Sequence, residues 1–355
     1  MEEFVLMKGN EAIAEAAIRA GTDGYFGYPI TPQSEVIEYL AAAKPHERTG
    51  MVLLQAESEV AAINMLYGGA GAGKKVMTSS SSPGISLMQE GISYIAGSEL
   101  PCLLVNVVRG GPGLGTIQPS QSDYFQSTKG GGHGDYNLIV LAPASVQEMA
   151  DFVSLGYDLA FKYRNPVMIL SDGAIGQMME KVKFKPQQPR SKKLPDWATT
   201  GKTPDRERNI ITSLDLDPAR QERFNNKLQA KYKEICKKEV RYEKIQCDDA
   251  EYLFVAYGTS SRICQKSMQM AREEGIKVGL FRPITLWPFP YNEIREMAEQ
   301  VKGILSVEMS AGQMVEDVKL AVEAKVKVDH YGRMGGIIAS PEEIVEALKQ
   351  KIIGG

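Results

Sequence analysis

Short apolar segments alternate with helical patterns along the first half of this chain, and this alternation restricts the fold more than any other feature. Cys102–Val108 is an almost wholly apolar segment, which is typical of a parallel strand buried on both faces. A helical pattern comes before it and places four apolar side chains on one face: Ile85, Met88, Ile92 and Ile95. The alternation predicts a doubly wound α/β domain.

Further elements follow from the same patterns. We expect strands at Gly24–Tyr28, Met51–Gln55, Val76–Thr78, Leu138–Leu141 and Val167–Leu170. A helix is expected over Val146–Phe161, and Asn10 is expected to cap an earlier helix that stops at Gly21. Near the end of the chain, Ser340 and Glu343 have the spacing of a capping box that begins the final helix.

The sequence changes character after the first half. Lys181–Pro218 is rich in Lys, Pro, Thr and Asp without a periodic pattern, so we expect an extended connection. Pro218–Glu243 has apolar residues at helical spacing, which predicts one amphipathic helix that packs against either domain or a partner. The last third alternates again, with strands expected at Tyr252–Tyr257, Lys277–Phe281, Ile304–Val307 and Lys327–His330. We therefore divide the chain into a first α/β domain (1–185), a connection with one helix (186–245) and a second α/β domain (246–355).

The composition is that of an ordinary globular protein, with 43% hydrophobic and 24% charged residues. The net charge of -3 argues against a broad basic surface for nucleic acid. No apolar run is long enough to span a bilayer, and the acidic start of the chain does not resemble a signal peptide. We therefore expect a cytoplasmic location.

The four cysteines are far apart in the sequence, at Cys102, Cys236, Cys247 and Cys264. Because none forms a Cys-x-x-Cys pair, the spacing of zinc sites and of iron–sulfur sites is missing. We expect four isolated thiols, no metal site in this chain and no iron–sulfur cluster held by this chain alone.

Two loops at expected strand ends carry side chains that could bind an anion or a ring. In open parallel sheets, ligands bind beyond the carboxyl ends of the strands. Thr31 stands before a helix and could either cap it or face an anionic ligand, and the segment alone favours the cap. Glu57 and Glu59 lie about 200° apart around a helix axis, so only one of them can face a given ligand.

Two further loops follow the next strands. Thr78–Gly84 has five consecutive hydroxyl side chains, which could bind an anion or simply form a flexible turn. Arg109 ends an apolar strand and needs a negative partner, because an unpaired buried charge is costly. That partner could be a structural Asp or Glu, but the glycines of the following Gly110–Gly115 leave space for a carboxylate ligand, which we favour.

Together, these loops resemble the 2-oxoacid:ferredoxin oxidoreductases. The segments GNEAIAEAAIRAG, GYPITPQSE, QAESEVAAINMLYGGAGAG, MTSSSSPGISLMQEG and RGGPGLG…QPSQSD occur in the order and spacing of the alpha subunit of that family. The likeness covers nearly the whole chain, with Lys181–Glu243 the weakest part. The segment GTDGYFGYPITPQSEVIEYL is most similar to the branched-chain type, which acts on 3-methyl-2-oxobutanoate, and the 2-oxoglutarate type is close behind.

The resemblance implies a thiamine-diphosphate-binding fold of the pyrimidine type, which is a doubly wound parallel sheet, and a transketolase C-terminal-like α/β domain after it. Glu59 matches the glutamate that hydrogen-bonds the aminopyrimidine ring nitrogen, as the catalytic residue. Thr31 and Arg109 match the residues that contact the carboxylate of the oxoacid. Residues beside the cofactor would be Tyr28, Pro29, Ile30, Ser82, Pro83 and Gly84.

The implied activity is a coenzyme A-dependent oxidative decarboxylation that yields acyl-CoA and carbon dioxide and passes electrons to ferredoxin. The family binds the diphosphate and magnesium through a Gly-Asp-Gly motif and a later Asn. The nearest match, Ser171-Asp172-Gly173, lacks the first Gly, and the next Asn, Asn209, is too distant. We therefore expect a beta subunit to carry the diphosphate and magnesium site, and a ferredoxin-like subunit or domain to carry the iron–sulfur clusters.

Two alternatives stay open. 2-Oxoglutarate would need a second cation, for which Lys129 is the candidate in these loops, although a solvated lysine is the simpler interpretation. A noncatalytic nucleotide-binding α/β protein would keep the fold but would give no reason for Glu59, Thr31 and Arg109 to converge. A structure with private ion-pair partners for Glu59 and Arg109 would argue against the enzyme.

Overall fold

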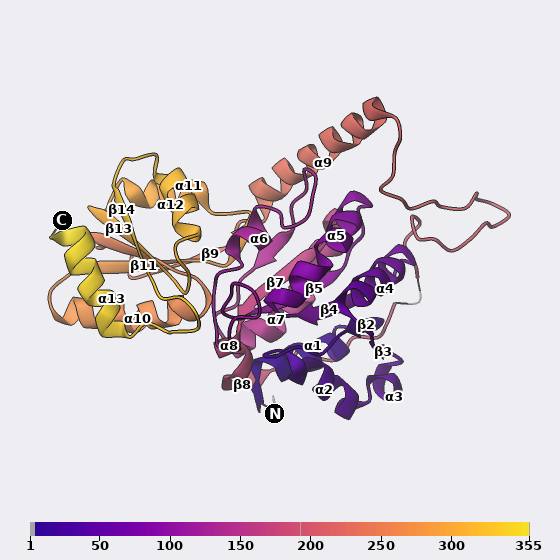
Figure 1. Cartoon of the computed structure of the whole chain (residues 1–355), viewed down its shortest axis with the longest axis horizontal. Coiled ribbons are helices and arrows are strands. Elements are labelled where there is room, and N and C mark those ends of the chain that lie inside the picture. The colour runs from indigo at the N-terminus through magenta and orange to yellow at the C-terminus, as the bar shows by residue number, and fades with distance from the viewer. Residues whose placement is uncertain (1–3, 192, 355) are drawn as a thin grey trace.

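The computed structural model describes residues 4–191 and 193–354, so Glu2 and Glu3 of the acidic start lie outside the described residues. Two sheets, each covered by helices, lie next to each other along the long axis of the molecule (Figure 1). None of the helices in the described ranges has the length and apolarity that a membrane span requires.

The first sheet has seven strands in the order β12-β6-β7-β5-β4-β2-β3. All are parallel except β12, which pairs antiparallel with β6 at the edge. The bounds are β2 Gly24–Gly27, β3 Val52–Gln55, β4 Val76–Ser80, β5 Leu103–Val108, β6 Ile139–Leu141, β7 Val167–Asp172 and β12 Thr285–Trp287. The expected strands of this domain are confirmed to within two residues at each end, and β12 was not expected.

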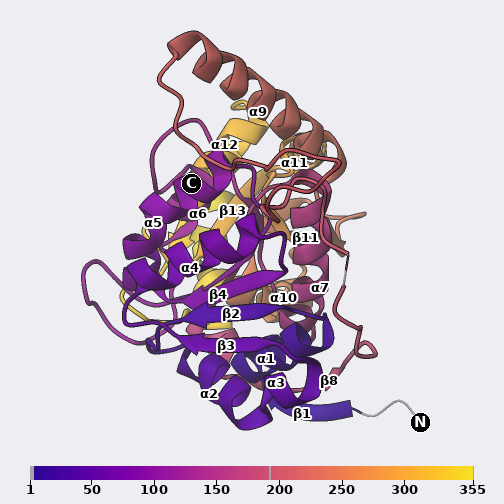
Figure 2. The same cartoon turned by 90° about the vertical axis from the view of Figure 1, so that its right-hand side faces the viewer.

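Helices cover both faces of this sheet (Figure 2). One face packs against α1 (Gly9–Arg19), α2 (Ser34–Ala43) and α7 (Val146–Tyr163), and the opposite face against α4 (Glu59–Gly71) and α5 (Ser82–Gly97). Shorter helices are α3 (Pro45–Thr49), α6 (Tyr124–Thr128) and α8 (Gly173–Gln177). This is the predicted doubly wound α/β domain.

The chain reverses its direction across the sheet between β2 and β4. It runs from β2 outward to β3, crosses back past β2 to β4, and then continues to β5 on the other side. Such a switch point opens a crevice beyond the carboxyl ends of the two central strands. The loop after β2 and the loop that joins β4 to α5 border this crevice, so the fold places two of the four predicted loops side by side.

The second sheet has five strands in the order β14-β13-β10-β11-β9, of which only β9 is antiparallel. Its strands are β9 Tyr242–Ile245, β10 Tyr252–Val255, β11 Val278–Pro283, β13 Gly303–Glu308 and β14 Lys327–Gly332. Its helices are α10 (Gly258–Glu273), α11 (Tyr291–Ala298), α12 (Met314–Val322) and α13 (Pro341–Leu348), which ends in a π-helical turn, Lys349–Ile353. The capping box is confirmed, because Ser340 Oγ accepts from Glu343 N at 3.2 Å and Glu343 Oε2 accepts from Ser340 N at 2.8 Å.

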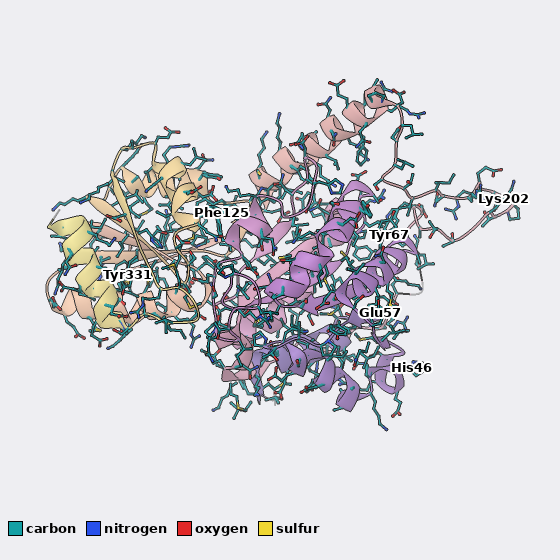
Figure 3. The ribbon with its side chains drawn as sticks, viewed as in Figure 1. His46, Glu57, Tyr67, Phe125, Lys202 and Tyr331 are labelled. Atoms are coloured by element: carbon teal, nitrogen blue, oxygen red, sulfur yellow. The ribbon has the colours of Figure 1, made fainter. Side chains whose placement is uncertain are left out.

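The connection holds one long helix, α9 (Pro218–Lys238). Its apolar side chains Leu228, Tyr232 and Ile235 are buried in the core of the first domain, which decides between the two alternatives for its packing. The helix ends before the expected Glu243, because β9 begins at Tyr242. Part of the connection extends away from both sheets, with Lys202 near its far end (Figure 3).

Three local expectations are wrong. Asn10 does not cap α1, because it lies inside the helix and its Nδ2 donates to Pro32 O at 2.7 Å. Thr31 is not the N-cap of α2, because that helix begins only at Ser34 and its N-cap is Gln33. The connection does not begin at Lys181, because strand β8 (Met179–Lys183) runs to Lys183 and pairs with β1 (Phe4–Lys8) as a separate two-stranded sheet.

The division into 1–185, 186–245 and 246–355 stays a proposal. Strand β12 belongs to the third segment but joins the sheet of the first. One core cluster also contains buried side chains of both, such as Leu104 and Met314. The two α/β units are therefore packed together through a shared core.

Candidate functional site

Arg109 lies directly after β5 and only 8% of its surface is exposed. Its Nη1 donates to Thr31 O and its Nη2 donates to Leu114 O, both at 3.0 Å. Within the described ranges, Nε has no acceptor and no carboxylate forms an ion pair with the guanidinium. The alternative of a structural Asp or Glu partner is therefore wrong, and a buried cation held by carbonyl oxygens can still bind an anion.

Ser82 connects the arginine to a buried carboxyl group. Ser82 Oγ accepts from Arg109 N at 3.1 Å and donates to Asp123 Oδ2 at 2.7 Å, and Asn106 Nδ2 donates to the same oxygen at 2.9 Å. Burial raises the pKa of Asp123, and the hydrogen bonds from Ser82 and Asn106 offset part of that effect. Asp123 was not predicted as a functional residue, although it ends the QPSQSD segment.

Glu59 is the first residue of α4, and only 6% of its surface is exposed. Its carboxylate has no hydrogen-bond or ion-pair partner among the residues that the structure describes. Glu57 is exposed instead, at the rim of the first domain, where it accepts a hydrogen bond from Ser58 Oγ at 2.7 Å (Figure 3). Glu57 precedes the N-cap Ser58 and lies outside α4, so the two carboxylates differ for a reason other than their spacing on a helix, and Glu59 is the buried one.

The start of α5 lies directly against Glu59. A Cβ atom on Gly84 would come within 2.7 Å of Glu59 Oε1 and 2.1 Å of Ser80 Oγ, so only glycine allows this approach. The buried hydroxyls of Thr78, Ser80 and Ser81 have no partner in the described part of the chain. Buried polar groups are normally satisfied, so this cluster is suited to a polar ligand or to ordered water.

Thr31 is exposed beside an apolar cavity of about 360 Å³, whose walls include Pro32, Ile117 and Ile338. Its position is fixed from behind, since Asn10 and Gln177 both donate to Pro32 O. Tyr28, Pro29 and Ile30 precede it and are partly exposed.

Gln33 joins this loop to the strand that carries the serines. Its Nε2 donates to Tyr28 O at 3.2 Å and its Oε1 accepts from Ser79 Oγ at 2.6 Å. The loop after β2 is therefore connected to strand β4 at the switch point.

A chain of contacts links the candidate residues. Thr31 touches Arg109, Arg109 touches Ser82, and two residues further along α5 Gly84 touches Glu59. Thr31 lines one cavity, and Ser82 and Pro83 line another. Neither Arg109 nor Glu59 is among the residues that line these two cavities.

Two other candidates have structural roles. Asp172 Oδ1 accepts from Ala174 N at 2.9 Å, which caps α8, and from Thr259 Oγ1 at 2.8 Å in the second domain. Lys129 is exposed, but its Nζ forms an ion pair with the buried Asp317. It is therefore not a free cation for a second substrate carboxylate.

Two family profiles cover most of the chain. Residues 15–246 match the one described as "Pyruvate flavodoxin/ferredoxin oxidoreductase, thiamine diP-bdg", and residues 250–344 match "Pyruvate:ferredoxin oxidoreductase core domain II". Fold and family profiles thus define a thiamine-diphosphate-dependent oxidoreductase, and the chain belongs to the pyruvate flavodoxin/ferredoxin oxidoreductase family. Its members oxidise 2-oxoacids as multisubunit complexes, with ferredoxin and coenzyme A as substrates. This membership excludes the alternative of a noncatalytic nucleotide-binding protein.

Individual relatives are similar over the whole length. The chain is 49% identical to the ketoisovalerate oxidoreductase subunit VorB of Methanothermobacter thermautotrophicus, with 97% of each chain covered. It is 37% identical to the 2-oxoglutarate synthase subunit KorA of Methanothermobacter marburgensis, with 98% of this chain and 99% of KorA covered.

Two solved structures are also similar. The 2-oxoglutarate:ferredoxin oxidoreductase of Magnetococcus marinus superposes with a TM-score of 0.86 at 30% identity, covering 99% of this chain and 66% of that one. A split-gene transketolase, 14% identical with a TM-score of 0.61, shares the fold. The thiamine-diphosphate fold of the pyrimidine type, with a transketolase C-terminal-like domain, is therefore confirmed.

The described residues fit one end of thiamine diphosphate. The buried carboxylate of Glu59 has no partner and lies against Gly84, where no larger residue would fit. The unpartnered hydroxyl of Ser80 lies against the same glycine. A flat heteroaromatic ring with nitrogen donors and acceptors would satisfy such groups.

Proposed function

We propose that this chain is the alpha subunit of a coenzyme A-dependent 3-methyl-2-oxobutanoate:ferredoxin oxidoreductase, and that it binds the pyrimidine ring of thiamine diphosphate and the oxoacid. The observation that carries the proposal is the pair of buried, unpaired charges, Glu59 and Arg109, beside one switch point. The identity with VorB supports the branched-chain substrate.

Thiamine diphosphate, when bound, supplies the carbon nucleophile and the electron sink for decarboxylation. Glu59 would share a proton with a ring nitrogen of the pyrimidine, in a site that excludes most water. Pro83 and Gly84 would form a wall beside the ring, together with Tyr28, Pro29 and Ile30 of the facing loop. These residues orient the cofactor.

Arg109 and Thr31 would hold the substrate carboxylate. The guanidinium retains an unpaired Nε–H, and its Nη1 donates to the backbone carbonyl of Thr31, a residue that lines the neighbouring cavity. Charge-assisted hydrogen bonds of this kind orient a carboxylate before it leaves as carbon dioxide.

The apolar cavity next to Thr31 supports a branched alkyl side chain on the substrate. Among the described residues, those that line it include Ile117 and Ile338 and no lysine or arginine. A second carboxylate, as in 2-oxoglutarate, would lack a cation there, and Lys129 is already paired with Asp317. The cavity therefore favours 3-methyl-2-oxobutanoate over 2-oxoglutarate.

Partner subunits would complete the enzyme. Because Asp172 is used as a cap and a contact between domains, it offers no magnesium site, and the proposed beta subunit would hold the diphosphate and magnesium. A ferredoxin-like subunit or domain would hold the iron–sulfur clusters. We also propose a cytoplasmic location, which suits four free thiols, Cys102, Cys236, Cys247 and Cys264.

The test is reconstitution with the proposed partner subunits. The complex should reduce ferredoxin fastest with 3-methyl-2-oxobutanoate, more slowly with 2-oxoglutarate and pyruvate, and only with coenzyme A present. The isolated chain should be inactive and should bind thiamine diphosphate weakly by calorimetry. Tight magnesium-dependent binding by the isolated chain would contradict the division between subunits, and a preference for 2-oxoglutarate would contradict the substrate.

A further inference from the structure

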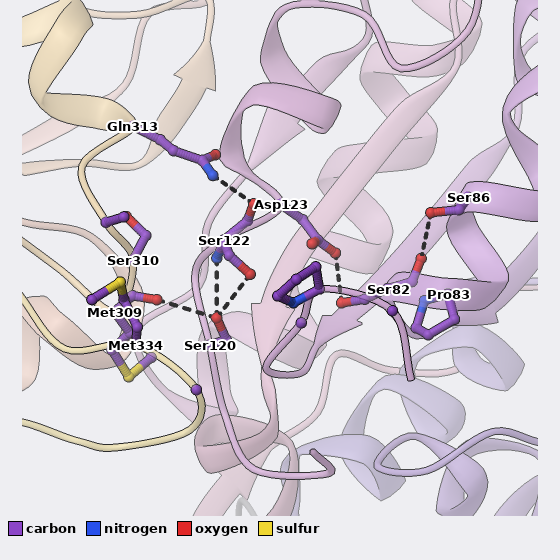
Figure 4. A pocket seen from close by; sticks show the side chains of 15 residues that line it. Ser82, Pro83, Ser86, Ser120, Ser122, Asp123, Met309, Ser310, Gln313 and Met334 are labelled. Carbon is purple, nitrogen blue, oxygen red and sulfur yellow. Dashed lines mark hydrogen bonds between the residues drawn. The ribbon is translucent and has the colours of Figure 1, made fainter. Parts of the chain in front are cut away.

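The carboxyl group of Asp123 belongs to a series of hydrogen bonds that ends at Arg109. Asp123 is the N-cap residue of the short helix α6, but its side chain makes no cap hydrogen bond to that helix. Its Oδ2 accepts instead from Ser82 Oγ of α5 at 2.7 Å (Figure 4) and from Asn106 Nδ2 of β5 at 2.9 Å. Aspartate is a favoured N-cap residue, so the position of this side chain is set by its distant partners rather than by its own helix.

Ser82 transmits this position to the backbone of Arg109. Strand β4 ends at Ser80, where the chain turns into α5, so the N–H of Arg109 lies beyond the last residue pair of β4 and β5. Ser82 Oγ accepts from that N–H at 3.1 Å. The carbonyl oxygen of Arg109 lies 3.3 Å from the same hydroxyl and is a second acceptor within its reach. The hydroxyl therefore has two ways to bond the backbone of the arginine.

Asp123 selects one of these two arrangements. A serine hydroxyl has a single hydrogen to donate and lone pairs with which to accept. The bond to Asp123 Oδ2, at 2.7 Å, is shorter than the 3.3 Å contact with Arg109 O, so the hydrogen points to Asp123. A lone pair of Ser82 is then directed at the N–H of Arg109. Without Asp123, the hydrogen can turn to the carbonyl oxygen, which loosens the bond to the N–H.

The second α/β unit holds Asp123 in its place. Gln313, the N-cap residue of α12, donates from Nε2 to Ser122 O at 2.7 Å and accepts at Oε1 from Phe125 N at 2.8 Å. One amide thus brackets Asp123 on both sides along the chain. These contacts border the cavity between the two units, which has a volume of about 630 Å³ and is lined by Asp123, Ser82 and Gln313 among others (Figure 4). Asp123 therefore links the second unit to the arginine of the first.

We infer that Asp123 is a positioning residue for oxoacid binding: through Ser82 it fixes the backbone of Arg109, and thereby the guanidinium that holds the substrate carboxylate. The inference rests on the proposed function, in which Arg109 binds that carboxylate. The guanidinium itself is bonded only to carbonyl oxygens of loop residues, Thr31 and Leu114, within the described ranges. Its firm attachment to the sheet is therefore its own backbone, and a small displacement of a group that orients a reactant is costly.

The test uses the reconstituted complex with Asp123→Ala, Asp123→Asn and, as the matched control, Asp158→Ala at an exposed position of α7. KM and kcat are measured for 3-methyl-2-oxobutanoate, and scanning calorimetry reports whether each variant is folded. Asp123→Ala should raise KM about tenfold, which corresponds to about 1.4 kcal/mol, with kcat within about threefold of the parent. Asp123→Asn keeps an acceptor oxygen for Ser82 and should raise KM no more than about threefold. Asp158→Ala should change neither constant.

Two further variants test the route of the effect. If Asp123 acts through the arginine, Asp123→Ala should raise KM by less than about twofold when Arg109→Met is already present. Gln313→Leu, from the second unit, releases the segment around Asp123 and should raise KM about threefold in the otherwise unchanged chain. Gln313→Leu also carries the test if Asp123→Ala does not fold.

An unchanged KM in Asp123→Ala, while Arg109→Met raises it, overturns the inference and leaves the proposed function intact. A fall in kcat alone also overturns it, because a purely structural defect lowers the amount of active enzyme without raising KM. So does an Asp123→Asn variant as impaired as Asp123→Ala, or an Asp123→Ala effect that persists in full beside Arg109→Met. If Arg109→Met itself leaves KM unchanged, the proposed role of Arg109 is wrong instead.

Discussion

At the scale of single residues, the proposed site is distinguished by two buried ionisable side chains that have no charged partner among the described residues. Other buried charges in the described residues have partners: Glu15 is bonded by Arg19 and Arg48, and Arg282 by Glu148 and Glu243. Burial alone would raise the pKa of Glu15, but the hydrogen bonds from Arg48 and Arg19 outweigh it and lower that pKa. Glu59 and Arg109 lack such partners, which is what a ligand site requires.

Glu59→Gln keeps the size of the side chain but removes the group that can share a proton with the cofactor ring. We expect the rate of oxoacid-dependent ferredoxin reduction to fall about 100- to 10,000-fold, with little change in thermal stability. Glu57→Gln, two residues away on the exposed side, is the matched control and should be as active as the parent. Equal activity of the two variants would remove Glu59 from the proposed role.

Arg109→Met should weaken oxoacid binding specifically. Loss of a charge-assisted hydrogen bond costs about 1.5–3 kcal/mol, so KM for the oxoacid should rise about 10- to 100-fold while KM for coenzyme A stays near the parent value. Steady-state kinetics on the complex give both constants. Arg109→Lys keeps the positive charge but not the planar guanidinium group. Its KM for the oxoacid should therefore lie between that of the parent and that of Arg109→Met. If KM for the oxoacid stays unchanged in Arg109→Met, another group binds the carboxylate.

At the scale of elements, most strands and helices could be predicted because each is set by a local pattern. The parallel strands of both units and the capping box at Ser340 are of this kind. The elements missed are short or depend on distant partners: β1 pairs with β8, and β12 pairs with β6. No local pattern identifies a three-residue edge strand whose partner lies more than a hundred residues earlier.

The same reason explains the local errors at the site. Asn10 and Thr31 have the side chains of helix caps, but distant contacts at Pro32 determine their conformation. Glu59, in contrast, could be chosen over Glu57 before the structure, because helix geometry allows only one of the two to face a ligand and the family resemblance assigns that role to Glu59. Asp123 and the cavity it lines could not be predicted, because they depend on how the second unit packs against the first.

Asp172 is the N-cap of α8, and its contribution to the free energy of unfolding should depend on pH in a defined direction. Burial raises its pKa, and hydrogen bonds from Thr259, Ile175 and Ala174 offset part of the effect, so the folded chain favours the neutral acid. The stability that this group contributes is therefore present below its unfolded pKa and is lost as the pH rises through the folded value.

Asp172→Asn keeps the Oδ1 acceptor without the charge. It should match the parent in denaturant unfolding near pH 3 and become relatively more stable as the pH approaches 7. Asp172→Ala loses the cap and should cost about 1–3 kcal/mol near pH 3, and less as the pH approaches 7, because it also removes the buried charge. A destabilisation by Asp172→Asn that grows with pH would contradict the direction of the pKa shift.

At the scale of the whole molecule, Gln121 is a central contact between the two units. This buried side chain donates to Tyr257 O at 2.8 Å and accepts from Ser260 Oγ at 2.6 Å and from Met309 N at 3.0 Å. Its backbone N donates to Met309 O at 2.9 Å. Its neighbours Ser120 and Ser122 line the cavity between the units, so the same short segment joins the units and shapes that cavity.

Gln121→Ala should leave several buried polar groups unpaired and lower the free energy of unfolding by about 2–4 kcal/mol. Differential scanning calorimetry should show the loss, and the transition should broaden or split as the two units become less coupled. Gln126→Ala, which loses one exposed hydrogen bond to Ser86, is the control and should change little. If the predicted loss of stability occurs but the calorimetric transition does not broaden, the two units unfold together even without this contact.

Strand β12 has a consequence for any shortened form of this protein. It covers the open edge of β6, whose residues Ile139–Leu141 are wholly apolar. A fragment that ends before Thr285 would expose that edge, and uncovered apolar edge strands pair with other copies and aggregate. We therefore expect shortened forms that end before Thr285 to aggregate, because the strand that covers this apolar edge comes from the last third of the chain.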